Sequence, residues 1–183
     1  GVLESTALGC VEGPRLDYRD GYFYLITAEG GTGFDHAVTL ARSREIDGPY
    51  EVAPNNPILT SRNTPHAPLQ RTGHADIVDT PEGDTYMVHL CSRPIPNRGH
   101  SPMGRETAIQ KMRWNREGWL ELACGGNVGQ TEIDTESHAP PTNRDQEQIE
   151  EFDTPILSDA FQTLRQAPNP DTASLQEKPG YLR

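Results

Sequence analysis

The strongest constraint on the fold is a pattern of four short segments that occurs twice along the chain. The first copy covers residues 13–26 and 38–52, with turns at Asp20-Gly21 and Asp47-Gly48. The second copy covers residues 73–88 and 108–122 in the same order. Pairs of an acidic residue and glycine between aromatic or β-branched runs are typical of hairpin turns. The pattern therefore predicts two antiparallel units of four strands each.

Four-stranded units that recur along a chain are typical of a β-propeller, in which each unit forms one blade. The composition agrees with an all-β fold, because 17 Gly and 16 Pro among 183 residues favour turns over helices. A propeller closes with at least about four blades. Two blades alone would leave open sheet edges, which proteins avoid. We therefore expect part of a longer protein, and the missing initiator Met agrees with this expectation.

A polar segment after the second unit divides the chain. Residues 126–151 contain the pair Pro140-Pro141 and an acidic run at 145–151, which together predict a solvated linker or loop. Residues 1–125 are then the propeller blades. Residues 152–183 read as the opening of a further β domain, and residues 180–183 as one of its strands.

Charge and cysteine content limit the classes of partner. The net charge of −11 argues against nucleic acid and anionic membranes as partners, whereas a neutral carbohydrate is compatible with it. No apolar run approaches the roughly 18 residues of a membrane-spanning helix. Cys10, Cys91 and Cys124 lack the spacing of a disulfide framework or a metal site. We expect them to be small buried residues.

Three residues at predicted strand ends are candidates for chemistry. Glu12 precedes a rigid Gly-Pro turn, which can hold its carboxylate at a fixed angle. His74 and Asp76 are two residues apart, so both side chains face the same side of a strand. Arg105 stands at a strand entrance, where its planar guanidinium can bind hydroxyl groups. Each also has an ordinary structural interpretation, which for Arg105 is a surface pair with Glu106.

The turn at residues 28–33 is rich in glycine and contains Thr32. It is not a phosphate-binding loop, because no Gly-Lys-Ser/Thr follows it. We interpret its glycines as backbone freedom beside a binding face. The pairs Asp35-His36 and Pro65-His66 are interpreted as ordinary loop residues.

Several motifs occur in a fixed order along nearly the whole chain, at residues 12–14, 24–32, 36–43, 48–51, 56–60, 73–76, 89–91, 104–111, 161–165 and 179–183. Together they resemble glycoside hydrolase family 43, particularly its two-domain β-xylosidase branch. The last two motifs resemble the start of the C-terminal β-sandwich of that branch. Many separate motifs in the right order are far more specific than any one of them.

The resemblance implies a five-bladed β-propeller with a central substrate pocket. It implies exo-acting, inverting hydrolysis of β-1,4-xylosidic bonds at the non-reducing end of xylo-oligosaccharides. Glu12 is then the general acid, His74 lies at the base of the pocket, Arg105 contacts the sugar in the cleaved subsite, and Thr32 binds substrate. The aspartate general base and a second aspartate that orients the acid have no counterpart here, and we expect both upstream of residue 1.

Other functions stay open. An α-L-arabinofuranosidase is a close alternative, because the same pocket geometry accepts either pentose. A non-catalytic sugar-binding propeller would keep His74 and Arg105 and lose the carboxylates, so Glu12 argues against it. A purely structural repeat leaves the placement of these residues unexplained.

The expected mechanism needs no cofactor. Some proteins of the family place calcium near the histidine that His74 matches. Calcium takes about six to eight oxygen ligands, and the residues visible here supply too few to assign a metal site.

Overall fold

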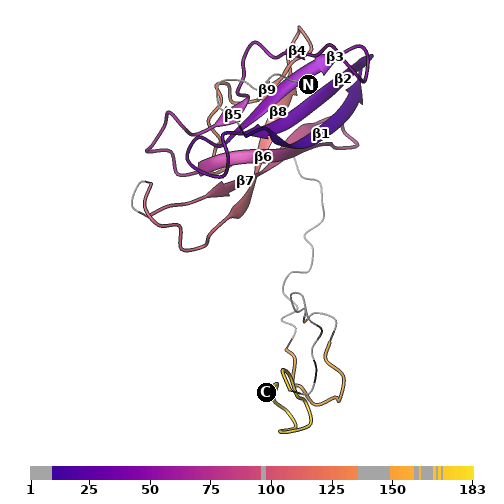
Figure 1. The fold of residues 1–183 in the computed structure, drawn as a ribbon, viewed down its shortest axis with the longest axis vertical. Coiled ribbons are helices and arrows are strands. Elements are labelled where there is room, and N and C mark those ends of the chain that lie inside the picture. Colours follow the sequence, from indigo (N-terminus) through magenta and orange to yellow (C-terminus); the bar gives the residue numbers. More distant parts are fainter. Residues whose placement is uncertain are drawn as a thin grey trace. The chain divides into compact units, whose positions relative to one another are not determined.

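The computed structural model describes residues 10–95, 98–135, 149–158, 161, 167, 169 and 171–183. The chain divides into two compact units, Gly1–Glu136 and Ser137–Arg183. Nine strands and no helix occur among the described residues, which confirms the all-β prediction (Figure 1). Within these ranges no helix has the length and apolar character needed to cross a bilayer.

Two antiparallel sheets make up the first unit. The first sheet has the order β1-β2-β3-β4, with β5 also paired to β3, and the second has the order β6-β7-β8-β9. The two predicted four-stranded units are therefore confirmed as two blades of propeller type. The strands are β1 (Glu12–Arg19), β2 (Tyr22–Glu29), β3 (Ala37–Ser43), β4 (Glu51–Val52), β5 (Leu59–Thr60), β6 (Gln70–Asp79), β7 (Thr85–Ser92), β8 (Glu106–Trp114) and β9 (Leu120–Leu122).

The outer strand of the first blade differs from the prediction, because it is divided between β4 and β5. Both segments pair with β3, one at each end of it. The side chain of Asn56 fills the gap, since its Oδ1 accepts from the Leu40 amide (2.9 Å) and its Nδ2 donates to the Leu40 carbonyl (2.8 Å). The amide side chain thus acts as a strand partner where the backbone turns away.

Local turn chemistry explains the first hairpin. Asp20 and Gly21, between β1 and β2, have φ values of 51° and 79°. A type I′ turn needs positive φ at both central residues, and an Asp-Gly pair meets this need at low cost. The turn therefore fixes the register in which Arg19 faces Tyr22.

The two blades pack face to face around a common core. Figure 1 shows β6 lying against β1, β2 and β3. Alternate side chains of each strand point into this interface, as period-two burial requires. The core residues are Tyr24, Ile26, Val38, Leu40, Ala53, Ile58 and Leu59 from the first blade and Ala75, Met87, Met112, Trp119, Leu120 and Leu122 from the second.

Polar contacts join the blades at the edges of this core. Arg42 donates to the Glu117 carbonyl (2.7 Å), and its guanidinium lies 3.9 Å from the centre of the Trp119 ring. The Tyr24 hydroxyl donates to the Gly118 carbonyl at 2.6 Å. The inner strands β1 and β6 are linked by two ion pairs, Arg15–Asp76 (3.0 Å) and Arg19–Asp79 (2.6 Å).

Residues 127–130 pack against both blades. The Asn127 carbonyl accepts from the Thr60 amide at 2.8 Å. The Gln110 side chain pairs with the Gln130 backbone through two hydrogen bonds of 2.8 and 2.9 Å. These residues thus form a loop that is hydrogen-bonded to the blades through Asn127 and Gln130, and the prediction of a linker or loop over residues 126–151 stays a prediction. The pair Pro140-Pro141 lies outside the described residues.

The cysteines follow the prediction only in part. Cys91 is buried in β7, whereas Cys10 and Cys124 are exposed. The expectation that all are buried is wrong for these two, because they stand outside the alternating pattern of the strands.

The second unit contains no strand among its described residues. Ser174 and Arg183 exchange two backbone hydrogen bonds (2.7 and 3.1 Å), so the strand predicted at residues 180–183 is reduced to one antiparallel pair. The rings of Phe152 and Phe161 pack at 5.5 Å between centres. That this unit begins a β-sandwich stays a prediction, and residues 162–165 of its motif lie outside the described residues.

Candidate active site

Each inner strand carries an irregularity near one end. In β1 the register shifts between Glu12 and Arg15, and Gly13 within the shift has a φ of 56°. In β6 the register shifts on both sides of Gly73, and the next residue, His74, has a φ of 49°. Few residues other than glycine adopt positive φ. Such bulges re-aim side chains and are common beside active sites.

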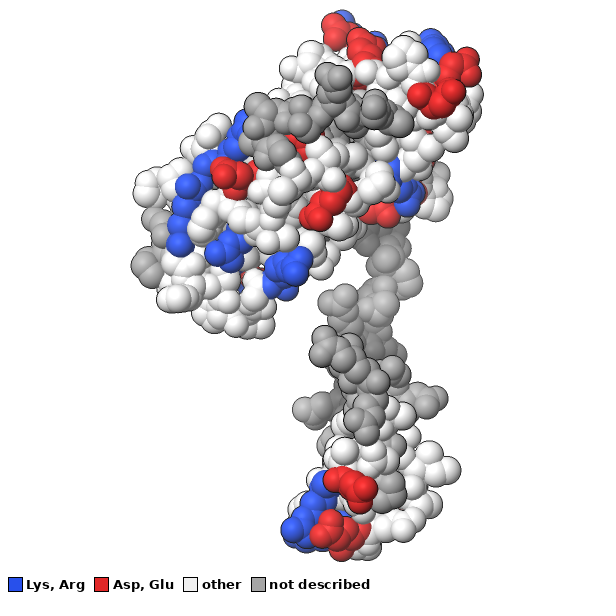
Figure 2. Space-filling view, viewed as in Figure 1, with Lys and Arg blue, Asp and Glu red and all other residues white. Residues whose placement is uncertain are grey.

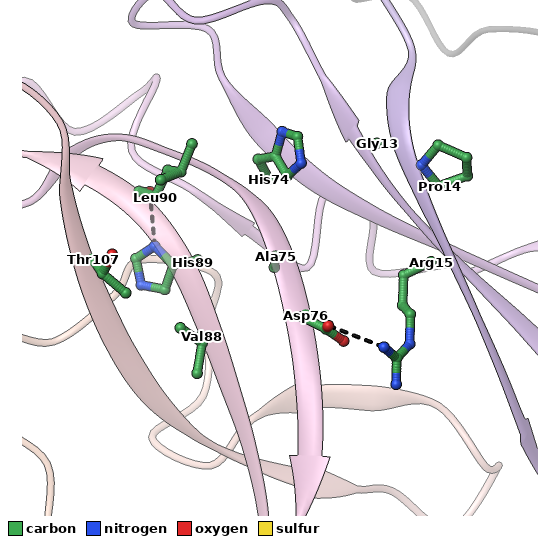
Figure 3. Close-up of a pocket in the computed structure, with 10 residues that line it drawn as sticks. All are labelled: Gly13, Pro14, Arg15, His74, Ala75, Asp76, Val88, His89, Leu90 and Thr107. Atoms are coloured by element: carbon green, nitrogen blue, oxygen red, sulfur yellow. Dashed lines mark hydrogen bonds and ion pairs between the residues drawn. The ribbon is translucent and has the colours of Figure 1, made fainter. Parts of the chain in front are cut away.

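The two irregular segments touch one another. Figure 3 shows the His74 ring beside Gly13. A Cβ atom at Gly13 would lie 2.8 Å from both Cε1 and Nε2 of the ring, so only glycine fits there. The structure thereby places His74 against the residue that follows Glu12 in the chain.

A hollow of about 430 Å³ opens beside this contact. It is lined by residues 13–15 of β1, 74–76 of β6, 88–90 of β7 and Thr107 of β8 (Figure 3). The Arg15–Asp76 ion pair lies along one side of it (3.0 Å). The volume is in the range of small-molecule sites. Both His74 and Asp76 are exposed toward this side, so the prediction that they share a strand face is confirmed.

His36, a residue interpreted as ordinary loop, is buried against Gly73, the residue before His74. Its ring is only 2% exposed, and its Nδ1–H donates to the Arg71 carbonyl (3.1 Å). Burial is the main cause that lowers the pKa of His36. The charges of His74 and Arg105 lower it further, and that of Glu12 raises it. Burial thus favours the neutral form of this imidazole, and the charges of His74, Arg105 and Glu12 act on it.

The predicted site residues lie on different elements of the two blades. Glu12 is exposed on β1, and Arg105 is exposed immediately before β8. Thr32 is exposed on the loop between β2 and β3, four residues before His36. His74 lines the hollow, whereas Glu12, Arg105 and Thr32 are not among its lining residues. No described hydrogen bond or ion pair joins these three side chains to His74, so their roles in the site stay predictions.

Glu106 does not pair with Arg105, contrary to the surface arrangement considered for it. Its carboxylate accepts from Nη2 of Arg93 at 2.6 Å and from Nε at 3.1 Å. These hydrogen bonds lower the pKa of Glu106. The acid next to Arg105 in the chain is therefore engaged elsewhere and does not neutralise its guanidinium.

A second buried histidine, His89, lines the hollow. His89 is 1% exposed, and its Nδ1–H donates to the Leu90 carbonyl (2.9 Å). Its Nε2 faces the Gln110 amide at 3.4 Å. Burial lowers the pKa of His89, and the charge of His36 adds to this. Burial thus favours the neutral form of both imidazoles, and each Nδ1 carries the hydrogen that it donates to a carbonyl.

Sequence reasoning missed both buried histidines. His89 alternates with Met87 and Cys91 on β7, and a histidine at an inward position of this pattern was a usable signal. His36 carried no such signal. It precedes β3, and it is buried by the irregular backbone of β6 far along the chain.

No group of three or more His, Cys, Asp or Glu side chains in the described ranges is placed to hold a metal ion. The hollow offers two imidazoles and the Asp76 carboxylate, which is paired with Arg15. This donor set does not fit a hard cation that takes about six to eight oxygen ligands.

The surface charge on one face of the first unit is mixed. On the face drawn in Figure 2, Lys and Arg side chains of the first unit stand among Asp and Glu side chains.

Comparison with known proteins gives consistent matches. The family described as glycosyl hydrolases family 43 matches residues 1–120. A xylan 1,3-beta-xylosidase of Vibrio sp is 45% identical over all of this chain, which covers 36% of that protein. A xylosidase/arabinosidase of Humicola insolens is 48% identical, with 90% of this chain and 30% of that protein covered.

Solved structures agree. The crystal structure of xylan beta-1,4-xylosidase from Bacillus halodurans matches with a TM-score of 0.90 and 43% identity, covering 99% of this chain and 34% of that one. The chain spans about a third of the length of the relatives it matches. The fold is thus part of a β-propeller, as the resemblance implied. The extent and identity of these matches show that the chain belongs to glycosyl hydrolase family 43.

Proposed function

We propose that the full-length polypeptide is an inverting glycoside hydrolase that removes xylose from the non-reducing end of β-1,4-linked xylo-oligosaccharides. The observation that carries the proposal is the close contact of His74 with Gly13, the residue that follows Glu12, beside a hollow of small-molecule size. The similarity to a solved xylan beta-1,4-xylosidase supports the same substrate class.

Inverting hydrolysis uses two carboxyl groups about 6.5–9.5 Å apart on opposite sides of the bond that breaks. Glu12 supplies the acid, which gives its proton to the leaving oxygen. The base takes a proton from water, which attacks the anomeric carbon from the other face. We assign the base to a part of the polypeptide outside this chain, since the chain spans about a third of its relatives.

The remaining site residues orient the sugar. The guanidinium of Arg105 donates to hydroxyl groups of the ring in the cleaved subsite, and Glu106 does not compete because Arg93 holds it. His74 forms the base of the pocket, and Thr32 contributes a hydroxyl at its rim. Holding the ring in one orientation makes proton transfer effectively unimolecular. These steps need no metal and no cofactor.

The acid role of Glu12 is tested with Glu12→Gln in the full-length polypeptide. General acid catalysis contributes about 10²- to 10⁴-fold. Turnover of xylobiose, which releases a poor leaving group, is expected to fall by that factor. Turnover of nitrophenyl β-xyloside, which releases a good leaving group, is expected to fall by much less. Glu82→Gln, at the exposed hairpin tip between β6 and β7, is the control and keeps wild-type rates. Equal losses on both substrates would argue against the acid role.

The 183-residue chain expressed alone is expected not to hydrolyse nitrophenyl xyloside, because proton donation alone does not activate water. Robust turnover by this chain would refute the assignment of the base to another part of the polypeptide.

An α-L-arabinofuranosidase is the second candidate, favoured by the similarity to a protein named xylosidase/arabinosidase. Rates of the full-length polypeptide on nitrophenyl β-xyloside and nitrophenyl α-L-arabinofuranoside separate the two. The 1,3- and 1,4-linked xylobioses separate the linkages. Binding of xylo-oligosaccharides without turnover of any substrate would instead show a non-catalytic sugar-binding propeller.

A further inference from the structure

The position of His36 is fixed on several sides. Its Nδ1–H donates to the Arg71 carbonyl (3.1 Å), and its own carbonyl accepts from the Thr60 hydroxyl (2.9 Å). Its Nε2 is buried without a hydrogen-bond partner among the described residues. Native structures contain few such atoms, because each costs free energy. A buried imidazole kept at this cost points to a role for the ring in shaping its surroundings.

The ring lies directly against the backbone of Gly73. A Cβ atom at Gly73 would stand 2.3 Å from Cδ2 of His36 and 2.5 Å from Cγ and Nε2. Gly73 does not have a positive φ, so backbone conformation alone does not require glycine there. The absence of a side chain at this position is needed to admit the imidazole.

His36 thereby contacts the irregular segment of β6 at two residues. It binds Arg71 through a hydrogen bond and Gly73 through packing, and the next residue is His74. Arg71 and His74 have φ values of 54° and 49°. Residues in such conformations persist only where their surroundings hold them.

The irregular segment of β6 in turn contacts the segment of β1 that carries Glu12. The His74 ring packs on Gly13, whose φ is 56° and which follows Glu12 in the chain. A continuous line of close contacts thus runs from His36 through Gly73 and His74 to Gly13.

We propose that His36 is a positioning residue, which sets the place of His74 and of the Glu12 carboxyl through the touching irregular segments of β6 and β1. His36 does not contact substrate in this account. The inference rests on the proposed glycosidase function. The proposal adds that the position of the Glu12 carboxyl relative to the leaving oxygen depends on the buried His36 side chain. That side chain takes no part in proton transfer.

The test uses three variants of the full-length polypeptide. His36→Leu keeps approximate volume and removes the donor to Arg71. His36→Asn keeps an N–H near the position of Nδ1 and is the conservative rescue. Thr85→Val removes a buried hydroxyl that donates to Asp79 at the opposite end of β6 and β7, so it reports a structural loss remote from the site.

A small misplacement of a catalytic group costs up to about 100-fold in rate. We expect His36→Leu to lower kcat on xylobiose by about 10- to 100-fold, with KM within about threefold of wild type and a smaller loss on nitrophenyl xyloside. His36→Asn should recover most of the loss. Thr85→Val should change neither kcat nor the ratio of the two rates.

Two outcomes would overturn the proposal. One is a His36→Leu variant whose rate ratio matches that of Thr85→Val, and the other is a His36→Asn variant no better than His36→Leu. A different result would refute the proposed function, namely a folded wild-type protein that cleaves no glycoside. In that case the NMR resonance of the His74 Cε1–H still decides the positioning role, which requires a larger shift in His36→Leu than in Thr85→Val.

Discussion

Gly13 has two physical reasons to be glycine, and they can be measured separately. Its φ of 56° disfavours any residue with a Cβ, and that Cβ would lie 2.8 Å from the His74 ring. Gly126 has a similar φ of 66°, and a Cβ there would meet no atom within 4 Å. Gly126→Ala therefore measures the cost of the backbone conformation alone, whereas Gly13→Ala adds the cost of the contact.

The two costs have known sizes. A left-handed conformation costs alanine about 1–2 kcal/mol, and the loss of chain entropy in the unfolded state returns about 0.4–1 kcal/mol. Gly126→Ala should thus lower the free energy of unfolding by about 1 kcal/mol. Crowding in a packed site costs a further 1–3 kcal/mol or so. Gly13→Ala should therefore be the more destabilising substitution by about that amount.

Urea denaturation of the full-length polypeptide measures both free energies, and xylobiose hydrolysis measures the effect on the neighbouring acid. Gly13→Ala is expected to lower kcat, and Gly126→Ala is expected to leave it unchanged. If both variants lose the same stability and the same activity, the close contact between Gly13 and His74 is absent, and the argument for a coupled site fails.

Two further predictions concern stability. Burial lowers the pKa of His36 and His89, so their contribution to stability is complete above about pH 6.5 and is lost as the pH falls below it. The free energy of unfolding between pH 7 and pH 5 should fall less steeply in His36→Leu than in wild type, and equal slopes would contradict this. Tyr24→Phe leaves the Gly118 carbonyl without its 2.6 Å donor and should cost about 1–2 kcal/mol by urea denaturation. Tyr50→Phe removes an exposed hydrogen bond to Ile46 and should cost much less, so a similar cost for both would refute the reasoning.

Local chemistry made the blades predictable from the sequence. The Asp20-Gly21 pair specifies its hairpin turn by itself, and its observed φ values of 51° and 79° are those that such a turn requires. The alternation of apolar residues in β2 and β7 likewise depends only on neighbours in the chain. The division of the outer strand into β4 and β5 was not predictable, since it depends on the Asn56 side chain reaching the backbone of Leu40.

Three candidate site residues could be identified from the sequence, whereas the buried position of His36 could not. Glu12, His74 and Arg105 stand in recognisable motifs, whereas the burial of His36 results from contacts with Arg71 and Gly73 some 35 residues further along the chain. No local sequence pattern indicates that an irregular segment of one strand contacts that of another strand. The contact between the two irregular segments likewise joins residues about 60 positions apart in the chain.

The stereochemistry of hydrolysis tests the central claim most directly. The full-length polypeptide is incubated with β-1,4-xylobiose, and ¹H NMR records the anomeric form of the first xylose released from the non-reducing end. An acid at Glu12 working with a separate base on water predicts that the α-anomer appears first and then mutarotates. Initial release of the β-anomer would show retention through a covalent intermediate and would contradict the account.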